Sequence, residues 1–447
     1  MKNKPTLSFW QIWNMSFGFF GIQFGWGLQM ANMSAIYTYL GANAGEIALL
    51  WLAAPVTGVL IQPLIGQASD RTWTRLGRRR PFILGGAILA SIALILMPNS
   101  PSVWIAAGLL WILDGTINAS MQPFRAMVAD NMPEEQSSQG FAVQSLFIGL
   151  GGTIASALPW MMTNWFGIPS EGAGKGHIPL SVTLSFYLGA AAFLGAVLWT
   201  VFSTKEIPPE EKELVDFRRR KFDWTLGLGD IFALFGHLPR KMWELGLVQF
   251  FTWIGMFCLW VYFSPAIANG VFHAQPGSVE MEDSGAWAGF CFAMYNAVCF
   301  AFSFVLLRAT RWTGPKLMHI VCLCIGAIGL LSIPLMNNKN ALLFSMVAIG
   351  IAWASILSMP YAILTPSLPK EKVGVMMGLF NLFIVFPQII ASGFLGKILE
   401  IFFNNNPMSA MVIGGISMAI AAVATVFVVK GNGKITSKEF MSTSPGH

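Results

Sequence analysis

The chain has 447 residues, of which 55% are hydrophobic and only 11% are charged, and its formal net charge is +6. Soluble domains carry roughly 25% charged residues, so this composition excludes an ordinary water-soluble domain, and the positive charge does not indicate nucleic-acid binding. We predict an all-α protein that crosses a lipid bilayer many times, in the inner or plasma membrane of its cell.

Apolar segments of bilayer-spanning length recur along the whole chain. A transmembrane helix needs about 20 largely apolar residues. By this measure we predict twelve transmembrane helices, at 8–36, 45–68, 81–98, 102–129, 138–164, 181–203, 243–269, 284–308, 315–335, 340–366, 373–398 and 408–429. The longest polar interruption divides them into six and six. We therefore predict two six-helix bundles, at 1–203 and 243–429, with a cytoplasmic linker at 204–242 and a cytoplasmic tail at 430–447.

The lysines and arginines predict how the chain is oriented in the bilayer. Cytoplasmic loops of membrane proteins carry an excess of these residues. With the N-terminus inside, the inner segments hold 23 of the 27 lysines and arginines. We therefore expect both the N-terminus and the C-terminus to be cytoplasmic.

A glycine- and arginine-rich segment follows the second predicted helix: "GQASDRTWTRLGRRRPFILGG", from Gly66 to Gly86. It resembles the signature loop of the major facilitator superfamily, G-x-x-x-D-R-x-G-R-R, except that Asp70 and Gly77 are seven residues apart instead of three. Positive-inside topology alone would explain the arginines, but not the glycines and the aspartate. The residues that we assign to this signature are Gly66, Asp70, Arg71, Gly77, Arg78 and Arg79.

The resemblance implies a cytoplasmic gate. Asp130 ends the fourth predicted helix on the same side as Arg78 and Arg79. A carboxylate–arginine pair at a membrane interface is less screened than a pair on an open surface. Such a pair is expected to hold the inner ends of the second and fourth helices together while the binding site faces outward.

The fourth predicted helix, 102–129, carries an acid and a base inside an apolar segment. At 100° per residue, Asn118, Gln122 and Arg125 lie within about 80° of Asp114, so all four share one face. Asp114 and Arg125 are about 16 Å apart along the axis and cannot pair on a straight helix. A charged aspartate in the bilayer centre costs roughly 2.5–3.5 kcal/mol, so Asp114 should face the bundle interior.

We predict that Asp114 takes up and releases a proton in the middle of the bilayer. Burial disfavours the charged form of a carboxyl group. The alternative is a structural acid that pairs with Arg125 or with a hydroxyl group. Arg125 either favours the deprotonated carboxylate and assists proton release, or forms an ion pair in the inner gate, and the sequence leaves both roles open.

Three segments of the first half resemble plant sucrose–proton symporters and, more widely, the glycoside-pentoside-hexuronide cation symporters. They are "GIQFGWGLQMANMSAIYTYLG", "QPLIGQASDRTWTRLGRRRPFI" and "LDGTINASMQPFRAMVAD". The second half is similar to this family only in layout. The resemblance implies a symporter that imports a disaccharide such as sucrose, maltose or a related glucoside, with the proton as coupling ion and no cofactor.

A sugar site needs hydrogen-bonding amides and an aromatic ring. Amides inside hydrocarbon are unfavourable unless they have a partner, so those within the predicted helices should face the interior. Any one of them alone is more often an interhelical hydrogen bond than a ligand contact. The predicted sugar-binding residues are Gln23, Trp26, Gln29, Asn118, Gln122, Gln249, Tyr295, Asn296, Tyr361 and Asn381.

Other functions of the same architecture remain open. A sodium-coupled or exporting sugar transporter would have the same layout, although a lone carboxylate argues mildly against a sodium site. A membrane sugar sensor is less consistent with the short tail. The sequence has no HExxH, Gly-x-Ser-x-Gly, phosphate-loop or metal-cluster motif, so we expect neither an enzyme nor a metal site. A single chain is sufficient for this design, and we expect a monomer.

Overall fold

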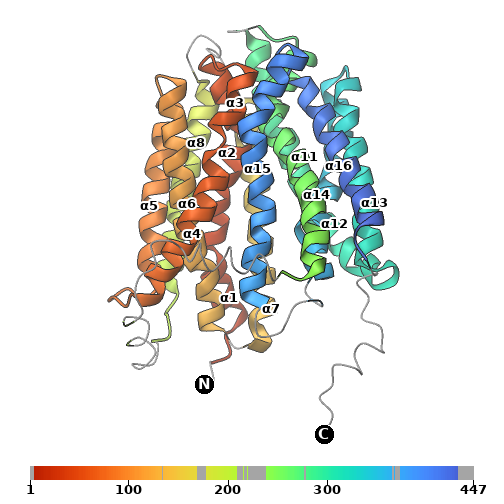
Figure 1. Ribbon diagram of the computed structural model, residues 1–447. Coiled ribbons are helices and arrows are strands. Elements are labelled where there is room, and N and C mark those ends of the chain that lie inside the picture. The colour runs from red at the N-terminus through yellow and green to blue at the C-terminus, as the bar shows by residue number, and fades with distance from the viewer. Residues whose placement is uncertain are drawn as a thin grey trace.

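The computed structural model of the protein describes residues 5–132, 134–168, 178–208, 215, 219, 238–275, 278–364, 367 and 373–430. These residues form α-helices joined by short turns, with no β-strand among them. Figure 1 shows the helices standing side by side, the first part of the chain beside the second.

The helices form two groups in chain order. The N-terminal group contains α1 (Phe9–Ser16), α2 (Gly18–Tyr39), α3 (Ala44–Leu50), α4 (Ala53–Arg71), α5 (Arg80–Leu96), α6 (Val103–Asn131), α7 (Glu134–Asn164) and α8 (Leu180–Ser203). The C-terminal group contains α11 (Arg240–Gly270), α12 (Val279–Thr313), α13 (Pro315–Ser332), α14 (Leu342–Leu364), α15 (Val373–Phe403) and α16 (Met408–Phe427). Most of the predicted linker and tail lies outside the described residues, so the predicted domain boundaries stay a prediction.

Each group packs mainly on itself. In the N-terminal group α2 packs on α7 and α8, and α6 packs on α4 and α5. In the C-terminal group α11 packs on α16, and α13 packs on α14 and α16. The groups meet along α7 and α12, and at α15, which packs on α3 and α4.

Eleven helical segments among the described residues are long and apolar enough to cross a membrane. The first of the twelve predicted helices, 8–36, is not one of them. The chain breaks at Phe17 into α1 and α2, and α2 has 22 residues. Its length is sufficient, but Gln23, Gln29 and Asn32 lower its mean hydropathy. A helix that carries several amides is thereby less apolar than the other spans.

Several helices extend past the apolar segments that predicted them. The segment predicted at 284–308 is the middle of α12, which has 35 residues. The Ser278 hydroxyl caps this helix by accepting a hydrogen bond from the Met281 amide at 3.3 Å. Apolarity reports where the bilayer lies, whereas the backbone hydrogen bonds of a helix continue until a cap or a turn ends them.

The two ends of the molecule differ in character. We call the end that carries Arg78, Arg79, Lys241 and Lys316 the basic end; α1 begins and α16 ends there (Figure 1). We call the opposite end, which carries the turn between α2 and α3, the far end.

At the far end, side-chain hydroxyls of one group donate to backbone carbonyls of the other. The Tyr262 hydroxyl donates to the Ala44 carbonyl at 2.9 Å, and Ser392 Oγ donates to the Ala48 carbonyl at 2.6 Å. A Cβ added to Gly396 would collide with the backbone of Gly45. The two groups are therefore in close contact at the far end.

Candidate functional site

Asp114 lies in the interior of the N-terminal group, on α6, and its side chain is fully buried. Gln29 of α2 is also fully buried, and its Nε2 donates to Asp114 Oδ1 at 2.6 Å. The second carboxyl oxygen, Oδ2, and Gln29 Oε1 have no hydrogen-bond partner among the described residues. A buried carboxyl group with one free oxygen can accept a proton without first breaking an ion pair.

A chain of amides continues from Asp114 to α4. Asn118 Nδ2 donates to the Asp114 backbone carbonyl at 2.9 Å. Gln62 Nε2 of α4 donates to Asn118 Oδ1 at 2.6 Å, and Thr57 lies 3.4 Å from Asn118 Nδ2. Three helices therefore contribute to one polar network in an otherwise apolar interior.

Arg125 lies outside this network. Its side chain is exposed, and it forms no hydrogen bond or ion pair with the described residues. Tyr361 of α14 lies within electrostatic range of the guanidinium. Arg125 therefore faces the C-terminal group, and it pairs with neither Asp114 nor the acids of the signature loop.

The charged residues of the signature loop meet at the basic end. Asp70 Oδ1 lies 2.8 Å from Arg78 Nη2 and 2.6 Å from Arg79 Nη2. Arg79 Nε also donates to Asp130 Oδ2 at 2.8 Å, while Arg71 at the end of α4 is half-buried. Arg79 thus connects the ends of α4 and α6. These pairs lie within the N-terminal group and are formed while the groups are in contact at the far end.

A further carboxylate, Glu206, completes this cluster. Its oxygens accept the backbone amides of Arg78 at 2.7 Å, Arg79 at 3.0 Å and Arg80 at 2.8 Å. These are free amides at the start of α5, where the positive end of the helix dipole favours an anion. The chain after α8 is therefore attached to the start of α5.

The additional residues in the loop form a tight turn. Thr74 and Gly77 exchange two backbone hydrogen bonds of 3.0 Å. Gly77 has φ +116°, and a Cβ there would lie 2.8 Å from the Glu206 carboxyl group. Glycine is required by both the backbone angle and the close approach of Glu206.

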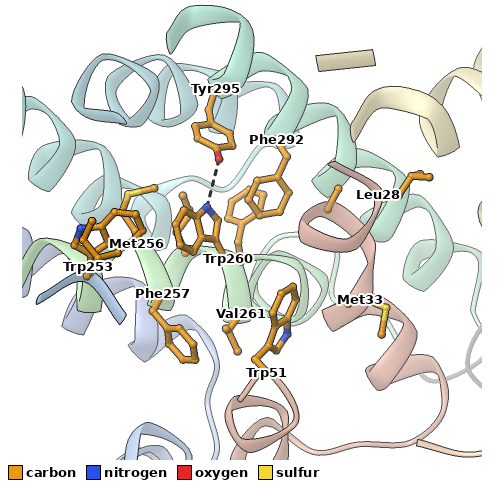
Figure 2. Close-up of a cluster of buried hydrophobic side chains, with 14 of the residues drawn as sticks. Leu28, Met33, Trp51, Trp253, Met256, Phe257, Trp260, Val261, Phe292 and Tyr295 are labelled. Carbon is orange, nitrogen blue, oxygen red and sulfur yellow. Dashed lines mark hydrogen bonds between the residues drawn. The ribbon is translucent and has the colours of Figure 1, made fainter. Parts of the chain in front are cut away.

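The interior of the C-terminal group contains an aromatic cluster instead of a polar network. The ring centroids of Trp253, Trp260 and Trp353 are 5.3–5.8 Å apart. Tyr295 of α12 joins them, and its hydroxyl accepts a hydrogen bond from Trp260 Nε1 at 3.3 Å (Figure 2). Gln249, one turn before Trp253 on α11, is fully buried, and neither end of its amide has a partner among the described residues.

Two predicted amides from different groups meet around a glycine of α7. A Cβ on Gly152 would lie 4.0 Å from Gln23 Oε1 of α2 and 3.9 Å from Asn296 Cγ of α12. Asn296 also donates to its own helix, at the Phe292 carbonyl. Gln23 and Asn296 therefore flank the same point of contact between the two groups.

The other predicted sugar-binding residues do not form one cluster. Trp26, Gln122 and Tyr361 are half-buried, and Asn381 is exposed. Gln122 lies against Gly66, where an added Cβ would be 3.9 Å from its side chain. Among the hydrogen bonds of the described residues, the Asp114 network includes Gln29 and Asn118 from the predicted set.

Residues 15–392 match the family described as the Major Facilitator Superfamily. The chain belongs to this superfamily. This chain is similar to "Sucrose transport protein SUC4" of Arabidopsis thaliana, with 26% identity over 92% of this chain and 86% of the relative. It is also similar to "Sucrose transport protein SUT1" of Oryza sativa subsp. japonica, with 25% identity over 95% of this chain and 88% of that protein.

Solved structures show the same fold. The nucleoside transporter NupG has a TM-score of 0.68 and 15% identity, covering 94% of this chain and 99% of that one. The D-xylose-proton symporter has a TM-score of 0.66 and 15% identity, and the match covers 96% of this chain and 100% of that one. The relatives are transport proteins and not enzymes, and the protein is a multi-pass integral membrane protein of the major facilitator fold.

Several residues of this candidate site were not predicted from the sequence. Gln62 carries the same signal as the predicted amides, a polar side chain inside an apolar segment. Trp260 and Trp353 were indistinguishable from tryptophans that lie at membrane interfaces. Glu206 stands in a polar segment, and its partners at 78–80 are more than 120 residues away, so only the fold reveals its role.

Proposed function

We propose that this protein is a proton-coupled symporter that imports a disaccharide, such as sucrose, maltose or a related glucoside, by alternating access. In this proposal α1 and α2 form the first of twelve transmembrane segments, both termini are cytoplasmic, and the basic end faces the cytoplasm. The sugar class is supported by the similarity to plant sucrose transport proteins over more than 90% of the chain.

The observation that carries the proton proposal is the environment of Asp114. The carboxyl group is fully buried, receives one hydrogen bond from Gln29, and has one oxygen free of partners among the described residues. An unpaired carboxylate in such a place is unfavourable, so closing the protein around it favours protonation. Protonation then removes the main electrostatic obstacle to closing the protein around the sugar-loaded site, and the sugar hydroxyls complete the hydrogen bonds that stabilise the closed state.

The transport cycle that we propose has four steps. Asp114 takes a proton from the outside, and sugar hydroxyls then bind the amides near it. The far end closes through the contacts of Tyr262 and Ser392. Proton and sugar leave toward the basic end, where the exposed charge of Arg125 favours the deprotonated carboxylate. The signature loop, with Asp70, Arg78, Arg79 and Asp130, serves as the cytoplasmic gate.

The test is uptake of labelled sucrose and labelled maltose into proteoliposomes, with and without an inward proton gradient. Wild-type protein should concentrate one of the sugars when the gradient is present. Asp114→Asn, which keeps the size of the side chain, should exchange sugar across the membrane but not concentrate it. Asp283→Asn makes the same chemical change at an exposed position of α12 and should behave as wild type.

Two results would contradict the proton proposal. One is a wild-type protein that ignores the proton gradient, in which case an inward sodium gradient is tested next. The other is an Asp114→Asn variant that still concentrates sugar. Outward movement of sugar against its gradient would indicate an exporter, and binding of sugar without any transport would indicate a sensor.

A further inference from the structure

The C-terminal group contains three buried polar atoms without partners, close together on one helix face. Gln249 Oε1 and Nε2 lack hydrogen bonds to the described residues, as does Trp253 Nε1. Gln249 and Trp253 are four residues apart on α11, so they lie on the same face. A buried polar group without a partner is destabilising by about 1–3 kcal/mol, and leucine at position 249 would avoid this. The choice of glutamine indicates a partner from outside the chain.

Trp253, one of these two residues, belongs to a cluster of aromatic rings. Trp253 packs edge-on against Trp353 of α14, with an interplanar angle of 79°, and Trp260 meets Trp353 at 86°. Trp253 and Trp260 are almost fully buried, whereas Trp353 is half-buried. The Trp353 ring is therefore the part of the cluster that a molecule can reach first.

The chemistry of the cluster defines the ligand. The Gln249 amide offers two donors and an acceptor, and Trp253 offers one donor, which matches hydroxyl groups that both donate and accept. The cluster of Gln249, Trp253, Trp260, Trp353 and Tyr295 contains no charged side chain, so an ion would find no counter-charge. A purely apolar ligand would leave the amide unpaired. A neutral ring with hydroxyl groups on its edge and C–H groups on its faces satisfies both the amide and the indoles.

We propose that Gln249, Trp253 and Trp353 form a subsite for one hexose ring of the transported glycoside, separate from the Asp114 network of the N-terminal group. This inference rests on the proposed function. Gln249 is fully covered in the present structure, so the hexose ring reaches the amide after the side chains that cover it move aside. The two sugar rings would then be divided between the groups, one beside Asp114 and one in the aromatic cluster.

The test measures equilibrium binding of labelled sucrose and labelled maltose to detergent-solubilised protein, with no proton gradient. Gln249→Leu should weaken binding by about tenfold or more, because it removes two hydrogen bonds to the ligand. The melting temperature of the sugar-free variant should stay unchanged or rise, because a buried amide without a partner has been removed. Trp104→Leu, at an exposed tryptophan of α6, is the matched control and should bind as wild type.

Each outcome decides between the subsite and a structural role. Gln249→Leu that binds sugar as tightly as wild type would mean that a trapped water satisfies the amide, and the subsite would be rejected. If Gln249→Leu does not fold, Trp353→Phe and Trp353→Leu replace it. Partial binding in the phenylalanine variant and loss in the leucine variant support the subsite, and wild-type affinity in both rejects it. Wild-type protein that binds neither sugar overturns the proposed function, and the subsite with it.

Discussion

In the N-terminal group, buried polar side chains bind one another across helices, whereas the C-terminal group fills the same depth with aromatic rings. Asp114, Gln29 and Asn118 form hydrogen bonds of 2.6–2.9 Å within and between α2 and α6. In the C-terminal group, Trp253 and Trp353 pack ring against ring and Gln249 has no partner among the described residues. The N-terminal group therefore contains a hydrogen-bonded network around a carboxyl group, and the C-terminal group contains a cluster of aromatic rings.

The same contrast appears at the basic end. Glu206 accepts three backbone amides at the start of α5, and its side chain is 5% exposed. The corresponding acid of the C-terminal group, Glu244, pairs with Lys241 at 3.0 Å and with the exposed Arg240 at 3.3 Å, and accepts the Lys430 amide. The first acid accepts three backbone amides, whereas the second accepts one and pairs with two side chains, of which Arg240 is exposed.

This difference predicts which kind of substitution damages each group. Removing a hydrogen-bonding group should be most harmful in the N-terminal group, where a partner is left buried and unpaired. In the C-terminal group, ring size should matter more than polarity. The first two predictions below test this difference, and the other two concern the signature loop and the far end; they run from the largest expected effect to the smallest.

Glu206→Ala should destabilise the protein by about 3–5 kcal/mol, because it leaves the backbone amides of Arg78, Arg79 and Arg80 without their acceptor at a buried position. Glu244→Ala should cost less, about 1–2 kcal/mol, because its partners can reach water. Thermal unfolding of the detergent-solubilised variants measures both. If the two variants lost equal stability, the two acids would contribute equally, and the proposed difference between the groups at the basic end would be wrong.

Gln29→Leu should reduce proton-driven sugar uptake by about 10- to 100-fold, because Asp114 loses its only side-chain donor, a charge-assisted bond worth about 1.5–3 kcal/mol. The control is Gln388→Leu in α15, an amide that bonds only to the Ile384 carbonyl of its own helix. That variant should stay within about twofold of wild type. Equal losses would show that any amide inside the helices matters as much as the one beside Asp114.

Gly77→Ala should destabilise the signature loop by about 1–3 kcal/mol, since it combines a positive φ with a clash against Glu206. Gly85→Ala, on α5, is the control: an added Cβ there meets nothing within 4 Å, so the change should be neutral or stabilising. Unfolding temperatures of the two variants give the comparison. A neutral Gly77→Ala would indicate that the Thr74–Gly77 turn and the Glu206 contact adapt easily.

Ser392→Ala should have the smallest effect, about 1 kcal/mol, because it removes one hydrogen bond between the groups at the far end. That loss should raise the population open at the far end about fivefold. Spin labels at Leu49 and Phe402, exposed on either side of this contact, would report the separation in a background with the exposed Cys324 replaced by serine. An unchanged distance distribution would mean that other contacts alone hold the far end closed.

The sequence predicted the helical membrane fold and eleven of its segments because the bilayer imposes a simple rule. About 20 apolar residues are needed wherever a helix crosses, whatever its neighbours are. The same rule made Asp114 conspicuous as a carboxyl group in an apolar segment. The segment predicted at 8–36 is helical, as α1 and α2, but it is not among the eleven, because three amides lower the mean hydropathy of α2.

The residues that the sequence singled out were not all brought together by the fold. Gln29 and Asn118 bond to Asp114, but Arg125 faces the other group and Asn381 is exposed. Helical periodicity places residues on one face of their own helix. It does not say which neighbouring helix that face meets, or at what height.

The amino-acid sequence by itself determined the membrane class of this protein, its helical content, the signature loop and the position of its one central acid, because each depends on local composition or on a short motif. Only the tertiary structure decided that Gln29 is the partner of Asp114, that Glu206 attaches the chain after α8 to the start of α5, and that Trp253, one turn after Gln249, packs against Trp353. These contacts join residues 85 to 128 positions apart. They depend on how helices pack, which no local pattern in the sequence records.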